Sequence, residues 1–315
     1  MLNFDNEKMK TTLNNRIPLF VWPIPVLAAL ACLAGIFSSA PDMIQSVETV
    51  RGTTVMLYGR GIYRHMSADV AIQGIAQDIV TLLFAIPAFL AGIRYHLKGC
   101  LSGTLILTGV TAYFMVTYFF YLCMGTFNEL FLVYVLLTGC SLYGFLDFYS
   151  QLLRKEGNLS FGDKKPTGAA GVFLIVNAAM ITLLWLSVVV PPLISGRIYP
   201  ESLQHYTTLI VQGLDLSVLL PASALAGVWL IKKDPRGRVL GPVYLVFLSL
   251  LMTALTAKVL KMTLNGVSAG PALGLIPALN LIAVYFSWKL IRMHSTPPSL
   301  SDPAKRPSEN SIAIY

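Results

Sequence analysis

The run at residues 101–123, LSGTLILTGVTAYFMVTYFFYLC, contains no charged side chain. A helix needs about 20 predominantly apolar residues to cross the hydrocarbon core of a bilayer, so this run predicts a membrane-spanning helix. In lipid the backbone must satisfy its hydrogen bonds within helices or closed barrels, and runs this long and apolar favour helices. Seven other stretches have the same character, which gives predicted spans at 18–38, 72–93, 101–123, 129–149, 169–192, 207–231, 239–262 and 271–291.

The composition of the whole chain agrees with this interpretation. Of its 315 residues, 55% are hydrophobic and only 12% are charged, whereas a soluble domain has about 25% charged residues. The predicted fold class is therefore an all-α, polytopic integral membrane protein with about eight transmembrane helices. The lipid bilayer is its first expected partner.

The basic residues predict the orientation. Short loops rich in Lys and Arg remain in the cytoplasm. With the N-terminus inside, 17 of the 23 basic residues fall on the inner side, so both termini are expected to be cytoplasmic. Basic loops facing anionic lipid account for the net charge of +8, and no nucleic acid partner is expected.

The chain divides into two predicted halves. Residues 18–157 form the first four-helix half, which includes an exterior loop at 39–71, and residues 169–293 form the second. A linker is expected at 158–168, a short cytoplasmic tail at 1–17 and a disordered, Pro- and Ser-rich cytoplasmic tail at 294–315. Within the exterior loop, SVETVRGTTVMLY at 46–58 predicts a β-hairpin around Arg51 and Gly52.

The first span has an alternative interpretation. It follows a basic segment and ends in FSSAPDM at 37–43, where small residues resemble a signal-peptidase site. Its apolar run is longer than that of an ordinary signal peptide, which favours a retained span.

Two short phrases suggest an internal repeat. GRGIY at 59–63 is echoed by GRIY at 196–199, and each is followed at a similar distance by a glutamine, Gln77 or Gln212. Because each half has an even number of spans, the halves are expected to be parallel four-helix repeats, as in some transporter folds. The phrases are interpreted as turns just outside spans 2 and 6, with Tyr63 and Tyr199 at the headgroup level.

Two acids within predicted spans are candidate functional residues. Charges inside a bilayer are costly and often functional, and Asp78 and Asp215 lie in spans 2 and 6. With the neighbouring amides Gln77 and Gln212 and the basic Lys258 of span 7, they could form a ligand or ion site. The alternative is that each acid only forms a structural ion pair with a basic side chain.

Other residues could line an entrance or a pocket. Arg60, Tyr63, Arg197 and Tyr199 lie in the exterior loops above spans 2 and 6. The deep tyrosines Tyr113, Tyr118 and Tyr134 could line a pocket for an apolar or aromatic ligand, or simply pack. Pro87 and Pro221 lie in the middle of spans 2 and 6, where each frees a backbone carbonyl.

Several chemistries have no support in the sequence. The four histidines, His65, His96, His205 and His294, are expected at interfaces or in loops, and the cysteines form no CxxC pair. Nucleotide-binding, hydrolase and zinc-protease motifs do not occur. We therefore expect no metal site, no cofactor and no catalytic residues, and do not expect an enzyme.

The segment LYGRGIYRHMSADVAIQGIAQD at 57–78, followed by VTLLFAIPAFL at 80–90, resembles bacterial multi-pass membrane proteins of unassigned function. The resemblance covers about residues 50–145. It implies the plasma (inner) membrane of a bacterium and transfers no activity or residue roles.

These observations favour transport or permeation of a small molecule or ion through a polar site in the outer half of the membrane, between spans 2, 6 and 7. The alternative is a non-catalytic accessory or sensory membrane subunit whose exterior loop binds a partner.

Overall fold

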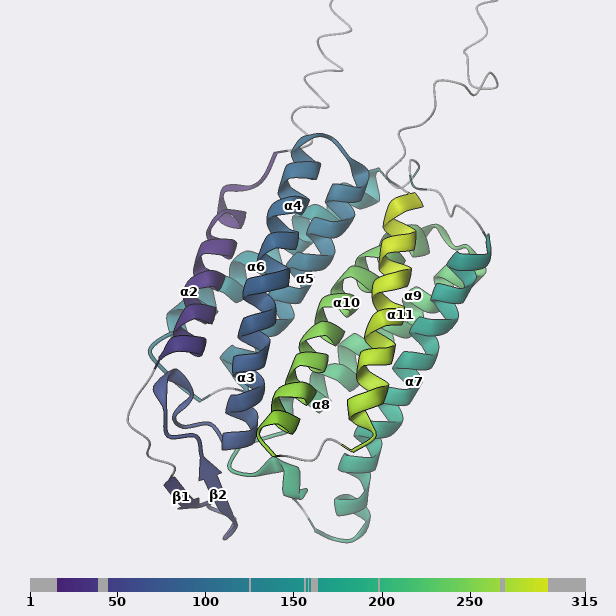
Figure 1. Ribbon diagram of the computed structural model, residues 1–315. Helices are drawn as coiled ribbons and strands as arrows, with labels where there is room; N and C mark the ends of the chain where they lie inside the picture. Colours follow the sequence, from purple (N-terminus) through teal and green to yellow (C-terminus); the bar gives the residue numbers. More distant parts are fainter. Residues whose placement is uncertain are drawn as a thin grey trace, which may run out of the picture.

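The structure, a computed structural model, describes residues 16–38, 45–124, 126–155, 157, 159, 164–197, 199–266 and 270–293. Long helices run side by side through most of it, and a small hairpin lies at one end (Figure 1). The elements in chain order are η1 (Leu19–Val21), α2 (Pro23–Phe37), β1 (Gln45–Glu48), β2 (Thr54–Leu57), η2 (Gly61–Tyr63), α3 (Ala68–Val80), η3 (Thr81–Ala85), α4 (Ile86–Leu97), α5 (Leu101–Cys123), α6 (Phe131–Arg154), α7 (Lys164–Ile194), η5 (Glu201–Leu203), α8 (Ile210–Leu214), η6 (Asp215–Leu219), α9 (Leu220–Lys232), α10 (Pro235–Leu264) and α11 (Ala272–Met293).

The predicted fold class is confirmed. Within the described residues, eight helices are long and apolar enough to cross a membrane, and each overlaps one predicted span. The expected linker is shorter than predicted, because residues 164–168 already belong to α7. Part of the candidate cleavage site after span 1, residues 158 and 160–163 of the linker, most of the first predicted tail and all of the second lie outside the described residues.

Helices α5 and α10 form the centre of the bundle. About two thirds of the membrane-spanning part of each is buried, compared with 17% for α7 and 11% for α11. Gly109 of α5 allows their close contact, since a Cβ there would lie 2.7 Å from the carbonyl oxygen of Val243 on α10. Small residues permit such approaches between membrane helices. Helix α10 also packs against α3, α9 and α11.

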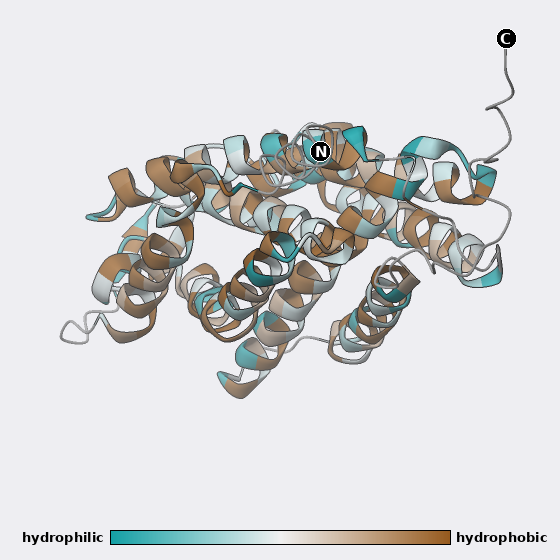
Figure 2. Cartoon of the chain, turned by 90° about the horizontal axis from the view of Figure 1, so that it is seen from above, coloured by the Kyte–Doolittle hydropathy of each residue, from teal (hydrophilic) through white to brown (hydrophobic). Residues whose placement is uncertain are grey.

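The outer surface of the bundle is apolar. Large side chains such as Leu132, Leu183 and Leu281 are exposed on α6, α7 and α11, and hydrophobic residues predominate along the helical ribbons in Figure 2. A surface of this extent is suited to lipid rather than to water.

Spans 2 and 6 are both interrupted at corresponding places. Each contains a five-residue π-helical segment, η3 or η6, followed by an α-helix with proline as its second residue. Pro221 lies 134 residues after Pro87. The same offset of 134 relates Thr81, the first residue of η3, to Asp215, the first residue of η6. Proline removes a backbone donor and disturbs the preceding turn, and π-helical segments occur frequently at functional sites.

The predicted hairpin is present and joins the two halves of the chain. Strands β1 and β2 pair antiparallel, with Gln45 opposite Leu57. From the turn between them, the Arg51 guanidinium donates to the carbonyl oxygens of Gln204 and Tyr206, each at 2.8 Å. It also lies 4.9 Å from the centre of the Tyr199 ring.

Replacing Gly109 by alanine should destabilise the bundle by about 1–3 kcal/mol, because the added methyl group overpacks the α5–α10 contact. Gly139→Ala on α6 is the matched control, since a Cβ there meets nothing within 4 Å. Unfolding of both variants in the same detergent measures the difference. Equal stability would contradict the assignment of α5 and α10 as the central pair.

Replacing Arg51 by alanine should loosen the exterior segments 45–67 and 199–206 together. Hydrogen bonds to a charged group contribute about 1.5–3 kcal/mol, and this side chain makes two of them. Hydrogen–deuterium exchange should increase in both segments. Arg51→Lys should increase exchange too, and an ammonium group also lacks the planar fork that reaches two carbonyls. An increase in exchange limited to the hairpin would contradict the conclusion that Arg51 holds the two segments together.

Candidate functional site

The candidate site is centred on Asp78, about three turns into α3. Its side chain is only 1% exposed. The buried residues of α3 include the small Ala71 and Gly74, which lie on the same side of the helix as Asp78 and let neighbouring segments approach. The sequence therefore places one carboxyl group on a face that the fold buries.

Two tyrosine hydroxyls hold the Asp78 carboxylate. Tyr63 of η2 donates to Oδ2 at 2.6 Å, and Tyr121 of α5 donates to Oδ1 at 3.0 Å. The Tyr121 hydroxyl also lies 3.1 Å from the carbonyl oxygen of Gly74. No basic side chain of the described part of the chain forms an ion pair with Asp78.

Helix α2 closes the opposite side of the carboxylate. Gly35 of α2 lies so near that any Cβ there would collide with Oδ2 of Asp78. One turn earlier on α2, the Cys32 sulfur lies 3.8 Å from the Tyr118 hydroxyl. The Asp78 carboxylate can therefore occupy this position only because residue 35 has no side chain.

Gln77 lies beside the acid and keeps one unpartnered amide atom. Its Nε2 donates to Tyr113 at 2.7 Å and to Thr117 at 3.2 Å, and its Oε1 has no hydrogen-bond partner in the part of the chain that the structure describes. Both partners are hydroxyls, which accept or donate, so turning the amide over would only exchange the unpartnered atom. The side chain is 4% exposed, so a polar atom remains buried and unsatisfied next to Asp78.

Four buried tyrosines and the partly buried Tyr121 surround these groups, and we call the five the tyrosine cluster. Ring contacts join them into one unit, with Tyr134 lying 6.1 Å from Tyr118 and 5.4 Å from Tyr121. The Tyr134 hydroxyl is another buried polar group for which the described residues provide no hydrogen bond. The members are Tyr63, Tyr113, Tyr118, Tyr121 and Tyr134.

Sequence reasoning found only part of this cluster. Tyr113, Tyr118 and Tyr134 were expected deep in the bundle and are buried there, but Tyr121 was not among the candidate residues. The spacing Tyr113–Thr117–Tyr121 identifies one helical face and could have placed all three near the same neighbour. The expected position of Tyr63 at the headgroup level is wrong, because its ring is buried and its hydroxyl reaches Asp78.

The second acid has a different environment. Asp215 is partly exposed and accepts a hydrogen bond of 2.7 Å from the indole N–H of Trp185 on α7. Gln212 is also partly exposed, and no hydrogen bond from it to another described residue is found. Aligning the two π-helical segments pairs Thr81 with Asp215 and Asp78 with Gln212. This alignment is shifted by one residue from the alignment that pairs Gln77 with Gln212.

Lys258 connects the acids electrostatically. Its side chain is partly exposed on α10, and it interacts with the charges of both Asp215 and Asp78. It forms no direct ion pair with either acid, nor with any other residue that the structure describes. The expected group of Asp78, Asp215 and Lys258 is therefore linked by electrostatic interactions across the bundle and not by salt bridges.

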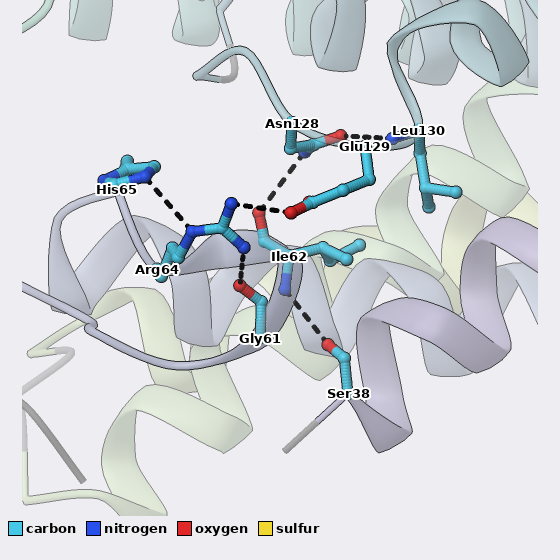
Figure 3. Close-up of polar contacts among 8 residues, drawn as sticks. All are labelled: Ser38, Gly61, Ile62, Arg64, His65, Asn128, Glu129 and Leu130. Carbon is cyan, nitrogen blue, oxygen red and sulfur yellow. Dashed lines mark hydrogen bonds and ion pairs between the residues drawn. The ribbon is translucent and has the colours of Figure 1, made fainter. Parts of the chain in front are cut away.

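A cap formed by residues 58–67 covers the Asp78 end of the site, and Figure 3 shows how part of it is held. The N–H of Ile62 donates to the Ser38 hydroxyl at 3.1 Å, and Asn128 donates to the Ile62 carbonyl at 3.3 Å. Gly61, at φ +54°, fits closely against Ser38 and permits this turn.

Charged and aromatic groups fasten the cap on its outer side. Arg64 donates to Glu129 at 2.6 Å (Figure 3), which holds the pKa of that carboxyl below its usual range. The His205 imidazole Nε2 donates to the His65 carbonyl at 3.1 Å, and the Tyr206 hydroxyl lies 3.3 Å from the backbone nitrogen of Ser67. The cap is thus attached to the loop that precedes α6 and to the loop between spans 5 and 6.

The other predicted exterior residues do not reach the acids. Arg197 is exposed, Arg60 is partly exposed, and Tyr199 lies under the Arg51 guanidinium. Of the four, only Tyr63 belongs to the site. The echoed phrases therefore share their positive-φ glycines, Gly59 and Gly196, but not their roles.

His96 lies in the last turn of α4, near the end of span 2, and is fully buried there. Its Nδ1 lies 2.9 Å from the Thr104 hydroxyl. Even so, no three His, Cys, Asp or Glu side chains within the described ranges are placed to share a metal ion.

Comparison with models of known protein families, with curated proteins and with solved structures finds no match for this chain.

Gly35→Ala should destabilise the protein by about 1–3 kcal/mol by overpacking and displace the Asp78 carboxylate. Gly74→Ala is the matched control, because its Cβ would lie 3.4 Å from the Tyr63 ring, an ordinary contact. Thermal unfolding in detergent compares the two. A larger loss for Gly74→Ala would show that the carboxylate is not held against α2.

Proposed function

We propose that this membrane protein transports a small molecule or ion, or lets it permeate, through the polar site between spans 2, 6 and 7. The supporting observation is the environment of Asp78: its carboxyl group is buried in a membrane-spanning bundle, is held by tyrosines and forms no ion pair with any described residue. A buried acid that served only to join helices would be expected to form a direct ion pair with a basic side chain.

The different exposure of the three charged groups supports a route across the site for the transported species. Lys258 and Asp215 are partly exposed, whereas Asp78 is enclosed. Asp215 begins η6, and Asp78 lies three residues before the start of η3. Interrupted helices at matching places in two repeats are typical of transporter binding sites, so the proposed repeat and the proposed site support each other.

The proposed location is the plasma membrane of a bacterium, with both termini in the cytoplasm. The cap and hairpin then face the exterior, and the tyrosine cluster lies in the outer half of the membrane. This orientation is based on the excess of basic residues on the predicted cytoplasmic side.

The proposal predicts that charge moves through the protein and depends on both acids. Purified full-length protein in proteoliposomes, adsorbed on a solid-supported membrane, is exposed to concentration jumps of protons, Na⁺, K⁺ and mixed amino acids. At least one jump should give a transient current, reduced at least about tenfold in Asp78→Asn and Asp215→Asn, equivalent to about 1.4 kcal/mol.

Asp147→Asn is the control, since this acid accepts from Gln151 near the other end of α6 and lies outside the site. Folded Asp78→Asn and Asp215→Asn variants with full currents would contradict the proposal and assign the acids a structural role.

One observation favours an accessory or sensory subunit as a second candidate. The hairpin exposes apolar side chains, with Val50 98% exposed and Val47 and Met56 partly so. Such a surface suits a protein partner. Stoichiometric co-purification of another protein, together with no current in any jump, would favour this function over transport.

A further inference from the structure

We propose that the ligand of Asp78 is a proton rather than a metal cation, and that the Tyr121 hydroxyl changes its acceptor as the proton arrives. This inference rests on the proposed function, since it names the ion that the polar site takes up.

The geometry around Tyr121 provides for both states of the acid. Its hydroxyl carries one hydrogen but lies within hydrogen-bond distance of two acceptors, Oδ1 of Asp78 at 3.0 Å and the Gly74 carbonyl at 3.1 Å. With Asp78 ionised, Tyr121 donates to Oδ1. With a proton on Oδ1, that oxygen donates to the Tyr121 oxygen, and Tyr121 donates to Gly74. A hydroxyl can donate and accept in this way without moving.

The other carboxylate oxygen keeps its partner in both states. Tyr63 donates to Oδ2 at 2.6 Å, and Oδ2 remains an acceptor whether it belongs to a carboxylate or to the C=O of a carboxylic acid. Protonation therefore forms one O–H bond at Oδ1 and breaks one O–H bond of a hydronium ion, which is released as water, and no electron is transferred. The site binds the proton without breaking a hydrogen bond to the acid.

The donor set does not suit a metal cation. Na⁺ and K⁺, like other hard cations, need several oxygen atoms whose lone pairs point at the ion. The hydrogens of Tyr63 and Tyr121 are directed at the two carboxylate oxygens instead, and Gly35 closes the remaining approach from α2. Lys258 of α10, which interacts electrostatically with Asp78, is a basic group and would repel a metal cation when charged.

The groups that face Asp78 agree with a single titrating acid. Every other titratable side chain that interacts with it electrostatically is a phenol, a thiol or an amine. Loss of the proton leaves Lys258 facing two carboxylates, Asp78 and Asp215, and uptake leaves it facing Asp215 alone. The facing groups are Cys32 of α2, Tyr63 of η2, Tyr113, Tyr118 and Tyr121 of α5, Tyr134 of α6 and Lys258 of α10.

Infrared spectroscopy of the full-length protein in lipid nanodiscs tests this directly, because a protonated carboxyl group has a C=O stretching band that a carboxylate lacks. Spectra are recorded from mildly acidic to mildly alkaline pH, in choline, Na⁺ or K⁺ salts of equal ionic strength. We expect a band that weakens as pH rises, disappears in Asp78→Asn and is the same in all three salts.

Tyr63→Phe identifies the band even if Asp78→Asn does not fold. It removes the donor to Oδ2, so the C=O band should move to higher frequency while its pH dependence persists. Tyr58→Phe is the control, since this neighbouring cap residue makes no side-chain hydrogen bond to Asp78. A purely structural Tyr63 would change stability but not the band.

The outcomes separate this inference from the proposed function. A band removed by Na⁺ or K⁺ at constant pH, or no band that responds to Tyr63→Phe or Asp78→Asn, would overturn the proton assignment even if currents are found. The expected band in a protein without currents would support the proton site and contradict transport.

Discussion

The Tyr63–Asp78 hydrogen bond is the interaction on which the arrangement of the site depends. A carboxylate removed from water must have its oxygens satisfied, and within the bundle it is tyrosine, rather than lysine or arginine, that does so. This requirement explains why the cap turns inward through Gly61, why position 35 has no side chain, and why the aromatic residues of α5 gather on one face. The cap is thus part of the buried site, because its residue Tyr63 completes the environment of Asp78.

The sequence was sufficient for the parts of the fold governed by local composition. Hydropathy located the spans, β-favouring residues around Arg51 located the hairpin, and Pro87 and Pro221 marked the interruptions of spans 2 and 6. The acids at positions 78 and 215 were identified because charge is rare in lipid. These inferences required no knowledge of which segments pack together.

The parts that were missed depend on contacts between distant segments. Tyrosine is suited both to a membrane interface and to a buried position with a hydrogen-bond partner, so the sequence does not distinguish the two for Tyr63. His96 presents the same ambiguity, which its contact with Thr104 resolves. Likewise, no local pattern shows that Arg51 reaches the carbonyls of Gln204 and Tyr206, more than 150 residues further along the chain. Packing decides each of these cases.

The bond between Arg51 and the second half has a consequence for biogenesis. Membrane proteins are made from the N-terminus onward, so the hairpin and the first spans are synthesised before Gln204 and Tyr206 exist. The carbonyls that receive Arg51, and the Tyr206 hydroxyl next to Ser67, arrive only with the exterior loop between spans 5 and 6. The acid enters the membrane with span 2, but the full enclosure of its site is completed late, when the second half has been inserted beside the first.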